Sequence, residues 1–168
     1  MKEEEAEHPF GDIGQLILFV LFLVVWAGDS FFLSISTFLS NFMALNIRLI
    51  ILGLALGAGA CLLVLGHAAV RHERCPTRVV STGVFQYVRH PLYFGCIWFY
   101  LGPSLATASL FSLGLLVMIF LFYNYIATYE EKWLDERFGE DYRSYKKRTG
   151  KWVPRIDTKR RKKETKIK

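Results

Sequence analysis

The chain has 168 residues, of which 52% are hydrophobic, and its formal net charge is +6. The apolar residues are gathered in long runs, because residues 91–129 and 49–70 contain no Asp, Glu, Lys or Arg. A run of about 20 apolar residues crosses a bilayer, and a chain of this length has too little volume to bury both runs. The composition therefore excludes a soluble enzyme, and its apolar content excludes a disordered chain.

Two segments in the first half of the chain are expected to form membrane-spanning helices. Residues 13–33 are almost entirely apolar except for Asp29, and residues 47–70 follow after a polar, uncharged connection at 34–46. An acid inside a membrane segment indicates a functional site by default, whereas an acid at a helix end is common. The residue type of Asp29 leaves both interpretations open, and we favour the helix end.

The uncharged run at 91–129 is too long for one span. As a single helix it would measure about 58 Å at 1.5 Å per residue, which is close to twice the hydrocarbon thickness of a bilayer. The sequence Gly-Pro-Ser at 102–104 offers a break in the helix. We therefore expect a helical hairpin with spans at 91–105 and 106–128.

Basic segments set the expected orientation of the chain. The loop at 71–90 and the tail at 156–168 are rich in Lys and Arg, whereas the connection between the first two spans is not. Because Lys and Arg favour the cytoplasmic side, we expect a multi-pass chain with both termini in the cytoplasm. Residues 129–155, which carry an amphipathic stripe, follow the last span on that side. The acidic first twelve residues do not resemble a signal peptide.

These features predict one membrane domain over residues 1–168. Its fold class is all-α: an integral-membrane bundle of about four transmembrane helices with a cytoplasmic C-terminal amphipathic helix. The basic tail is expected to face anionic membrane lipids, and no nucleic-acid partner is expected because no aromatic–basic module accompanies it. The three cysteines lack a Cys-x-x-Cys spacing, which indicates neither a disulfide framework nor a metal site.

A helical hairpin of the last two spans would bring charged residues together at its open end. It places Arg89, His90 and Tyr93 near Glu130. Pro91 suits the first turn of a helix, where backbone N–H groups attract an anion, whereas Glu130 attracts a cation. This pair fits a ligand that carries a carboxylate and an ammonium, such as an amino-acid moiety. An Arg89–Glu130 ion pair, with His90 as a helix cap, explains the same residues equally well.

Three stretches of the second half resemble a known family. Residues 81–95 read STGVFQYVRHPLYFG, Glu130-Glu131 follows, and residues 138–148 read FGEDYRSYKKR. In this order and at these spacings they resemble the isoprenylcysteine carboxyl methyltransferase family, which is related to the membrane phospholipid N-methyltransferases. The resemblance covers residues 76–155, about half of the chain.

The resemblance implies an integral-membrane methyltransferase that uses S-adenosylmethionine as its cofactor. The acceptor would be lipophilic and would enter from the bilayer, and the first choice is O-methylation of a prenylcysteine-like carboxylate. Residues 129–155 would then form the catalytic segment. A Tyr that contacts the cofactor in the family is replaced by Phe85, so its hydroxyl is lost. The implied cofactor-binding residues are Thr77, Arg78, Val79, Val80, Phe85, His90, Pro91, Leu92, Tyr93 and Glu130.

One departure from the family concerns the acceptor. The family pattern has an Arg four residues before the cofactor-binding Glu, where it would hold the substrate carboxylate, and here Ile126 stands at that position. Either another cation serves, such as Arg89 or Lys132, or the acceptor is not a carboxylate. An ionised carboxylate needs no general base, whereas an amine acceptor would need one, for which His90 or Glu131 are candidates. No catalytic residue is assigned.

Three other functions remain open. A phospholipid or amine N-methyltransferase would use the same cofactor. An NADPH-dependent sterol-reductase-like enzyme shares part of the pattern, but such enzymes carry an acid after Tyr-x-Gly, where this chain has Cys96. A non-enzymatic membrane protein would be expected to lose the His90 and Glu130 pair, which this chain keeps.

Overall fold

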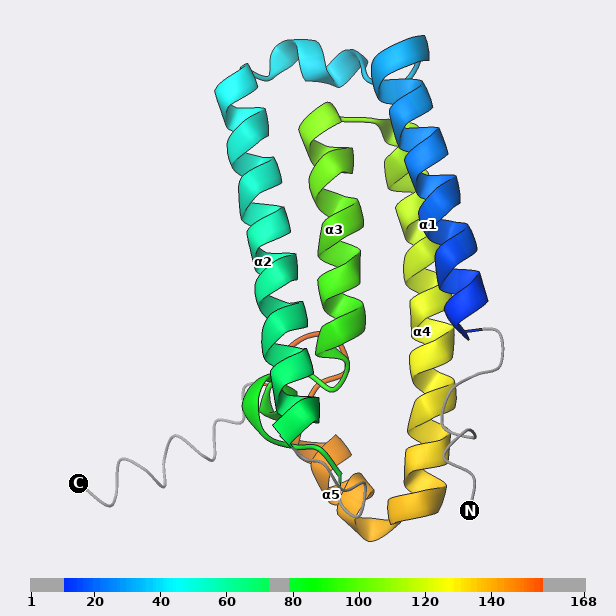
Figure 1. The fold of residues 1–168 in the computed structure, drawn as a ribbon, viewed down its shortest axis with the longest axis vertical. Coiled ribbons are helices and arrows are strands. Elements are labelled where there is room, and N and C mark those ends of the chain that lie inside the picture. Colours follow the sequence, from blue (N-terminus) through cyan, green and yellow to red (C-terminus); the bar gives the residue numbers. More distant parts are fainter. Residues whose placement is uncertain (1–10, 73–78, 156–168) are drawn as a thin grey trace, which may run out of the picture.

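The computed structural model of the chain describes residues 11–72 and 79–155 (Figure 1). Within these residues the regular elements are five α-helices and three short 3₁₀ or π turns, without a β-strand, so the expected all-α class is confirmed. Two of the implied cofactor-binding residues, Thr77 and Arg78, and the basic tail at 156–168 lie outside the described residues.

The first two long helices come from nearly continuous apolar sequence. Helix α1 covers Gly11–Ala27 and continues as a π turn over Gly28–Leu33. It ends at Ser34, whose backbone is left-handed with φ 51°. A 3₁₀ turn at Phe38–Phe42 leads into helix α2, which covers Leu45–His72. These two helices correspond to the segments expected at 13–33 and 47–70.

The break expected at 102–104 is wrong, because helix α3 runs from Pro91 to Thr107 straight through Pro103. Trp26 Nε1 donates to the carbonyl oxygen of Pro103 at 3.3 Å, and Thr107 Oγ1 donates to the same oxygen at 2.9 Å. The bond from Trp26 ties α1 to this part of α3. The chain turns instead at Ala108, with φ 50°, and Ser109, whose Oγ accepts from Ser112 N at 3.2 Å as the N-cap of the next helix.

Helix α4 covers Leu110–Phe138, so it starts four residues later than the span expected at 106–128 and continues beyond it. Gly139 ends it with φ 52°, a left-handed backbone that glycine adopts without a Cβ penalty. Helix α5 then covers Glu140–Arg148 and folds across the end of the bundle (Figure 1).

The four long helices run side by side, and α2 packs against α3 while α1 and α3 pack against α4 (Figure 1). Helices α2 and α3 approach closely at Gly59 and Gly95, where a Cβ on either residue would lie 3.0 Å from the carbonyl oxygen of the other. The buried core lies between α1, α3 and α4 and contains Phe22, Ile97, Tyr100, Ile119 and Tyr123.

Three helical segments of the described chain are long and apolar enough to cross a membrane: Gly11–Leu33, Leu45–Arg71 and Leu110–Phe138. Helix α3 has 17 residues, which is at the lower limit of about 17–25 residues for a transmembrane helix. Its role as a fourth span therefore stays a prediction. Large apolar side chains on the outer surface, such as Leu54 at 71% exposure, suit a lipid environment.

Candidate active site

The start of α3 meets the end of α4, and this contact forms the candidate site. The Tyr93 hydroxyl donates to Glu130 Oε1, and His90 Nδ1 lies 3.6 Å from Glu130 Oε2. The rings of His90 and Tyr93 are stacked with centroids 5.8 Å apart. His90 is buried, but the Glu130 side chain keeps 25% of its exposure. The expected approach of His90 and Tyr93 to Glu130 is therefore present.

Arg89 pairs with Glu131 rather than with Glu130, so the alternative of an Arg89–Glu130 ion pair is wrong. Arg89 Nε and Nη2 both lie 2.9 Å from Glu131 Oε1, and the two side chains are only 8% and 6% exposed. Glu131 also lies 3.3 Å from His90 Nε2 and 3.0 Å from Lys146 Nζ. One buried carboxylate therefore joins α3, α4 and α5.

The local backbone explains how His90 is placed. Proline disfavours helical backbone in the residue before it, and His90 has φ −121° and ψ 63°, outside the helix that Pro91 begins. The His90 side chain makes no capping hydrogen bond, so its expected role as a helix cap is wrong. Its ring instead turns toward the two glutamates.

The segment after α5 closes the site from the other side. Val88 forms a parallel bridge with Gly150, and Arg89 N donates to Gly150 O at 2.9 Å. Arg89 Nη1 also donates to Thr149 O at 2.6 Å. The Tyr145 hydroxyl donates to Phe85 O at 2.7 Å, and burial raises the pKa of Tyr145, which keeps this donor protonated.

Two residues of this closing segment were missed by the sequence analysis. The Trp152 ring lies 6.0 Å from the His90 ring, and its Nε1 donates to Asn124 Oδ1 at 3.1 Å. Lys151 Nζ donates to Asn124 O at 3.1 Å and to Thr128 Oγ1 at 2.7 Å. Partial burial lowers the pKa of Lys151. Nothing in the local spacing pointed to them, because the tertiary fold brings residues 151 and 152 back to α4.

The remaining predicted residues are placed less centrally. Val79 and Val80, the first residues described after residue 72, are half-buried. Phe85 accepts the hydrogen bond of the Tyr145 hydroxyl with its backbone carbonyl. Leu92 points toward α2, since a Cβ added to Gly66 would lie 2.8 Å from its Cδ2.

The two ends of the site favour ligand groups of opposite charge. The α3 N-terminus offers the positive end of a helix dipole, and its first-turn N–H groups lack intrahelical acceptors. Glu130 of α4 offers a partly exposed carboxylate that accepts a hydrogen bond from Tyr93. Tyr93 lies in the first turn of α3. This donor set fits a zwitterionic ligand, with its anionic group at the helix end and its cationic group at Glu130.

The region that forms the candidate site is similar to known methyltransferases. The family model for phospholipid methyltransferase matches residues 65–141, which contain α3, α4 and both glutamates of the site. The chain is 36% identical over 81 residues to protein-S-isoprenylcysteine O-methyltransferase of Saccharomyces cerevisiae, a match that covers 46% of this chain and 33% of that protein.

Two further relatives match about half of the chain. Methanethiol S-methyltransferase 1 of Bradyrhizobium diazoefficiens is 31% identical over 85 residues, covering 51% of this chain and 29% of that protein. Protein-S-isoprenylcysteine O-methyltransferase of Schizosaccharomyces pombe is 32% identical over 79 residues, covering 46% and 34%. The match spans about a third of the length of each relative, and no solved structure matches with comparable significance. Residues 65–141 are thus similar to the phospholipid methyltransferase family, and about half of the chain is similar to isoprenylcysteine O-methyltransferases.

Proposed function

We propose that the chain is an S-adenosylmethionine-dependent methyltransferase that acts on a lipophilic acceptor. The observation that carries this proposal is the position of Glu130, held by Tyr93 and facing His90 at the first turn of α3. A carboxylate beside a helix N-terminus fits the two charges of the cofactor's amino-acid moiety, and residues 65–141 match the model of the phospholipid methyltransferase family.

The residues present fit this cofactor by the chemistry of their donor groups. Glu130 would accept hydrogen bonds from the α-ammonium, and the α3 N-terminus would face the α-carboxylate. When bound, S-adenosylmethionine supplies a sulfonium methyl group that a nucleophile can displace.

The chain's own residues would act mainly by holding this geometry. Glu131 fixes Arg89 and His90 through buried contacts of 2.9 Å and 3.3 Å, so His90 has little freedom to turn. The Trp152 ring lies beside that of His90, tilted by 42°. Alignment of two reactants and exclusion of water are sufficient to accelerate a displacement at an already reactive methyl group. We place this end of the bundle and both termini in the cytoplasm.

For the acceptor, our first choice is the carboxylate of a prenylcysteine-like molecule. Ile126 is only 2% exposed in the core and supplies no cation. Arg89 is already bound to Glu131, Thr149 O and Lys146 O. Lys151 is the better candidate for binding the carboxylate, since its ammonium contacts two neutral oxygens of α4, Asn124 O and Thr128 Oγ1, whereas Arg89 is paired with the Glu131 carboxylate. An ionised carboxylate would then need no base.

The second candidate is N-methylation of a phospholipid or another amine. The apolar Ile126 and the match to the phospholipid methyltransferase model favour it. An amine must lose a proton before it attacks. Glu131 contacts Arg89, His90 and Lys146, whereas His90 also lies 3.6 Å from Glu130 at the ligand end of the site, so His90 is the better placed base.

The test is calorimetric binding of S-adenosylmethionine and, separately, NADPH to the detergent-purified protein. We expect binding of S-adenosylmethionine alone, weakened at least about tenfold, or about 1.4 kcal/mol, by Glu130→Ala. Glu136→Gln, at an exposed position of the same helix, is the matched control and should bind like the wild type. Binding of NADPH alone would favour a sterol-reductase-like enzyme. Binding of neither, or unchanged affinity in a folded Glu130→Ala, would overturn the assignment.

A further inference from the structure

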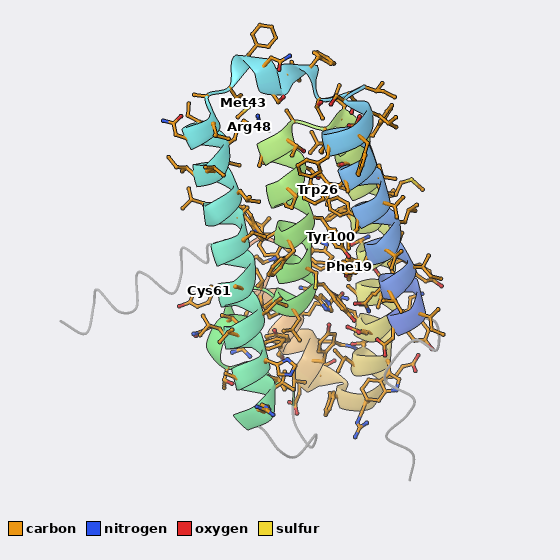
Figure 2. The ribbon with its side chains drawn as sticks, turned by 45° about the horizontal axis from the view of Figure 1, so that its top comes forward. Phe19, Trp26, Met43, Arg48, Cys61 and Tyr100 are labelled. Atoms are coloured by element: carbon orange, nitrogen blue, oxygen red, sulfur yellow. The ribbon has the colours of Figure 1, made fainter. Side chains whose placement is uncertain are left out.

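The connection between α1 and α2 exposes large apolar side chains at the end of the bundle opposite α5 and the candidate site (Figure 1). Figure 2, in which this end comes forward, shows side chains on the outer side of the connection, close to Met43 and Arg48. Phe32 and Phe42 are 84% and 85% exposed. We define the apolar patch as six exposed side chains of this region: Phe31, Phe32, Ile35, Phe38, Leu39 and Phe42.

Polar side chains of the same region lie in the interior beneath the patch. Asp29, Ser36 and Thr37 are all buried. The Asp29 carboxylate accepts from the backbone N–H groups of Ile35 at 3.1 Å and Ser36 at 3.0 Å, and also from the Ser36 hydroxyl. A surface loop in water is expected to bury its apolar side chains and expose its polar ones. This connection has the opposite arrangement, and Asp29 fixes its backbone in that arrangement.

The connection also carries no charge and pairs part of its own backbone. Residues 30–47 contain no Asp, Glu, Lys or Arg, and the exposed polar side chains between 34 and 44 are those of Ser34 and Asn41. Ser34 N donates to Asp29 O at 2.8 Å, and Ser40 N donates to Thr37 O at 2.8 Å. Charged side chains and unpaired backbone groups are costly in lipid. The composition and the backbone pairing of the connection therefore suit contact with lipid.

Helix length places the patch at the edge of the bilayer's hydrocarbon. Leu110 and Glu130 are 20 residues apart on α4, a rise of about 30 Å at 1.5 Å per residue, which equals the hydrocarbon thickness. With Glu130 at one boundary, the start of α4 lies at the other. Phe111 N donates to Ser36 Oγ at 3.1 Å, so the connection lies at that second boundary. The patch is continuous with the outer surface of the membrane helices, since Leu45 at the start of α2 is also exposed.

We propose that the apolar patch is a lipid-binding surface, inserted among the phospholipids of the leaflet opposite the candidate site. Apolar side chains on a surface element bind the membrane interface in proportion to the apolar area that they bury, and each aromatic side chain supplies about 150–250 Å². The patch anchors the bundle at a fixed depth, which keeps Glu130 at the other boundary. The inference goes beyond the proposed function and does not depend on it.

The experiment uses the full chain in phosphatidylcholine nanodiscs that hold one chain or, separately, two chains. First, a phospholipid with a diazirine in its acyl chain is photolysed with the wild type, and the cross-linked residues are identified by mass spectrometry. Second, Phe42→Cys reacts with a membrane-impermeant maleimide. Glu136→Cys, at an exposed position near the other end of the bundle, is the control. Mass spectrometry follows the peptide of each introduced cysteine separately from the native cysteines, and each labelling rate is divided by the rate in SDS.

In nanodiscs with one chain, we expect cross-links within residues 31–42. We also expect Phe42→Cys to react at least about tenfold more slowly than Glu136→Cys, because the reactive thiolate needs access to water. The chain itself leaves residue 42 exposed, so this protection would come from lipid. Equal rates, or the absence of cross-links within residues 31–42, would overturn the inference. Protection that appears only in nanodiscs with two chains would assign the patch to a second copy and would also overturn it.

Discussion

Replacement of Glu131 by Gln tests whether the buried ion cluster holds the site together. The Glu131 carboxylate contacts Arg89 twice at 2.9 Å, His90 at 3.3 Å and Lys146 at 3.0 Å, and its side chain is 6% exposed. Glutamine keeps the shape and one acceptor oxygen but removes the charge. The Arg89 guanidinium then stays buried next to neutral acceptors, which are the new amide oxygen and the carbonyls of Thr149 and Lys146.

The magnitude follows from this geometry. Removing one partner of a buried ion pair costs roughly 3–5 kcal/mol, because the other charge remains buried without compensation. Glu131→Ala should approach that range. Glu131→Gln retains an acceptor, so we expect a loss closer to about 2 kcal/mol, the scale of a hydrogen bond to a charged group.

The assay is reversible unfolding in mixed detergent–SDS micelles, followed by tryptophan fluorescence. Asp135→Asn is the control, since it removes an ion pair of similar length, 2.9 Å to Arg143, whose side chains are 37% and 54% exposed. Exposed pairs contribute about 0–1 kcal/mol, so the control should change the free energy of unfolding little. An equal effect of the two variants would refute the idea that Glu131 fixes the site.

Two further predictions use matched changes. Tyr145→Phe removes the hydroxyl that donates to Phe85 O at 2.7 Å and should destabilise the protein by about 1 kcal/mol. Tyr142→Phe should be neutral or stabilising in the same unfolding assay, because the buried Tyr142 hydroxyl has no partner among the described residues. Lys151→Met should raise the KM of a carboxylate acceptor about tenfold and leave that of an amine acceptor unchanged; equal effects on both would exclude Lys151 as the carboxylate's partner.

Much of the architecture could be predicted because it depends on local sequence. Long apolar runs give α1, α2 and α4, and Pro91 begins α3 as its residue type predicts. The approach of Tyr93 to Glu130 also followed from sequence, since a hairpin of two antiparallel helices brings the start of one to the end of the other.

The errors come from contacts that local sequence does not contain. Pro103 reads as a helix break, but α3 runs through it, and Trp26, 77 residues earlier in the chain, donates to its carbonyl. The sequence suggests Arg89 as a partner for Glu130, but Arg89 faces the next residue on α4, Glu131. Consecutive helical residues differ in direction by about 100°, so the choice between two adjacent glutamates depends on the rotation of the packed helix. Spacing alone does not fix that rotation.

The exposure of three acids separates structural from ligand-binding roles. Asp29, 3% exposed, accepts from the backbone N–H groups of Ile35 at 3.1 Å and Ser36 at 3.0 Å and from Ser109 Oγ at 2.5 Å. It therefore ties the end of α1 to the start of α4, and Glu131 ties α3, α4 and α5 at the opposite end of the bundle. The Glu130 side chain, in contrast to Asp29 and Glu131, is 25% exposed. A bundle closed by buried carboxylates at both ends can hold Glu130 in place without burying it, and that is the condition for a carboxylate to bind a ligand with little reorganisation.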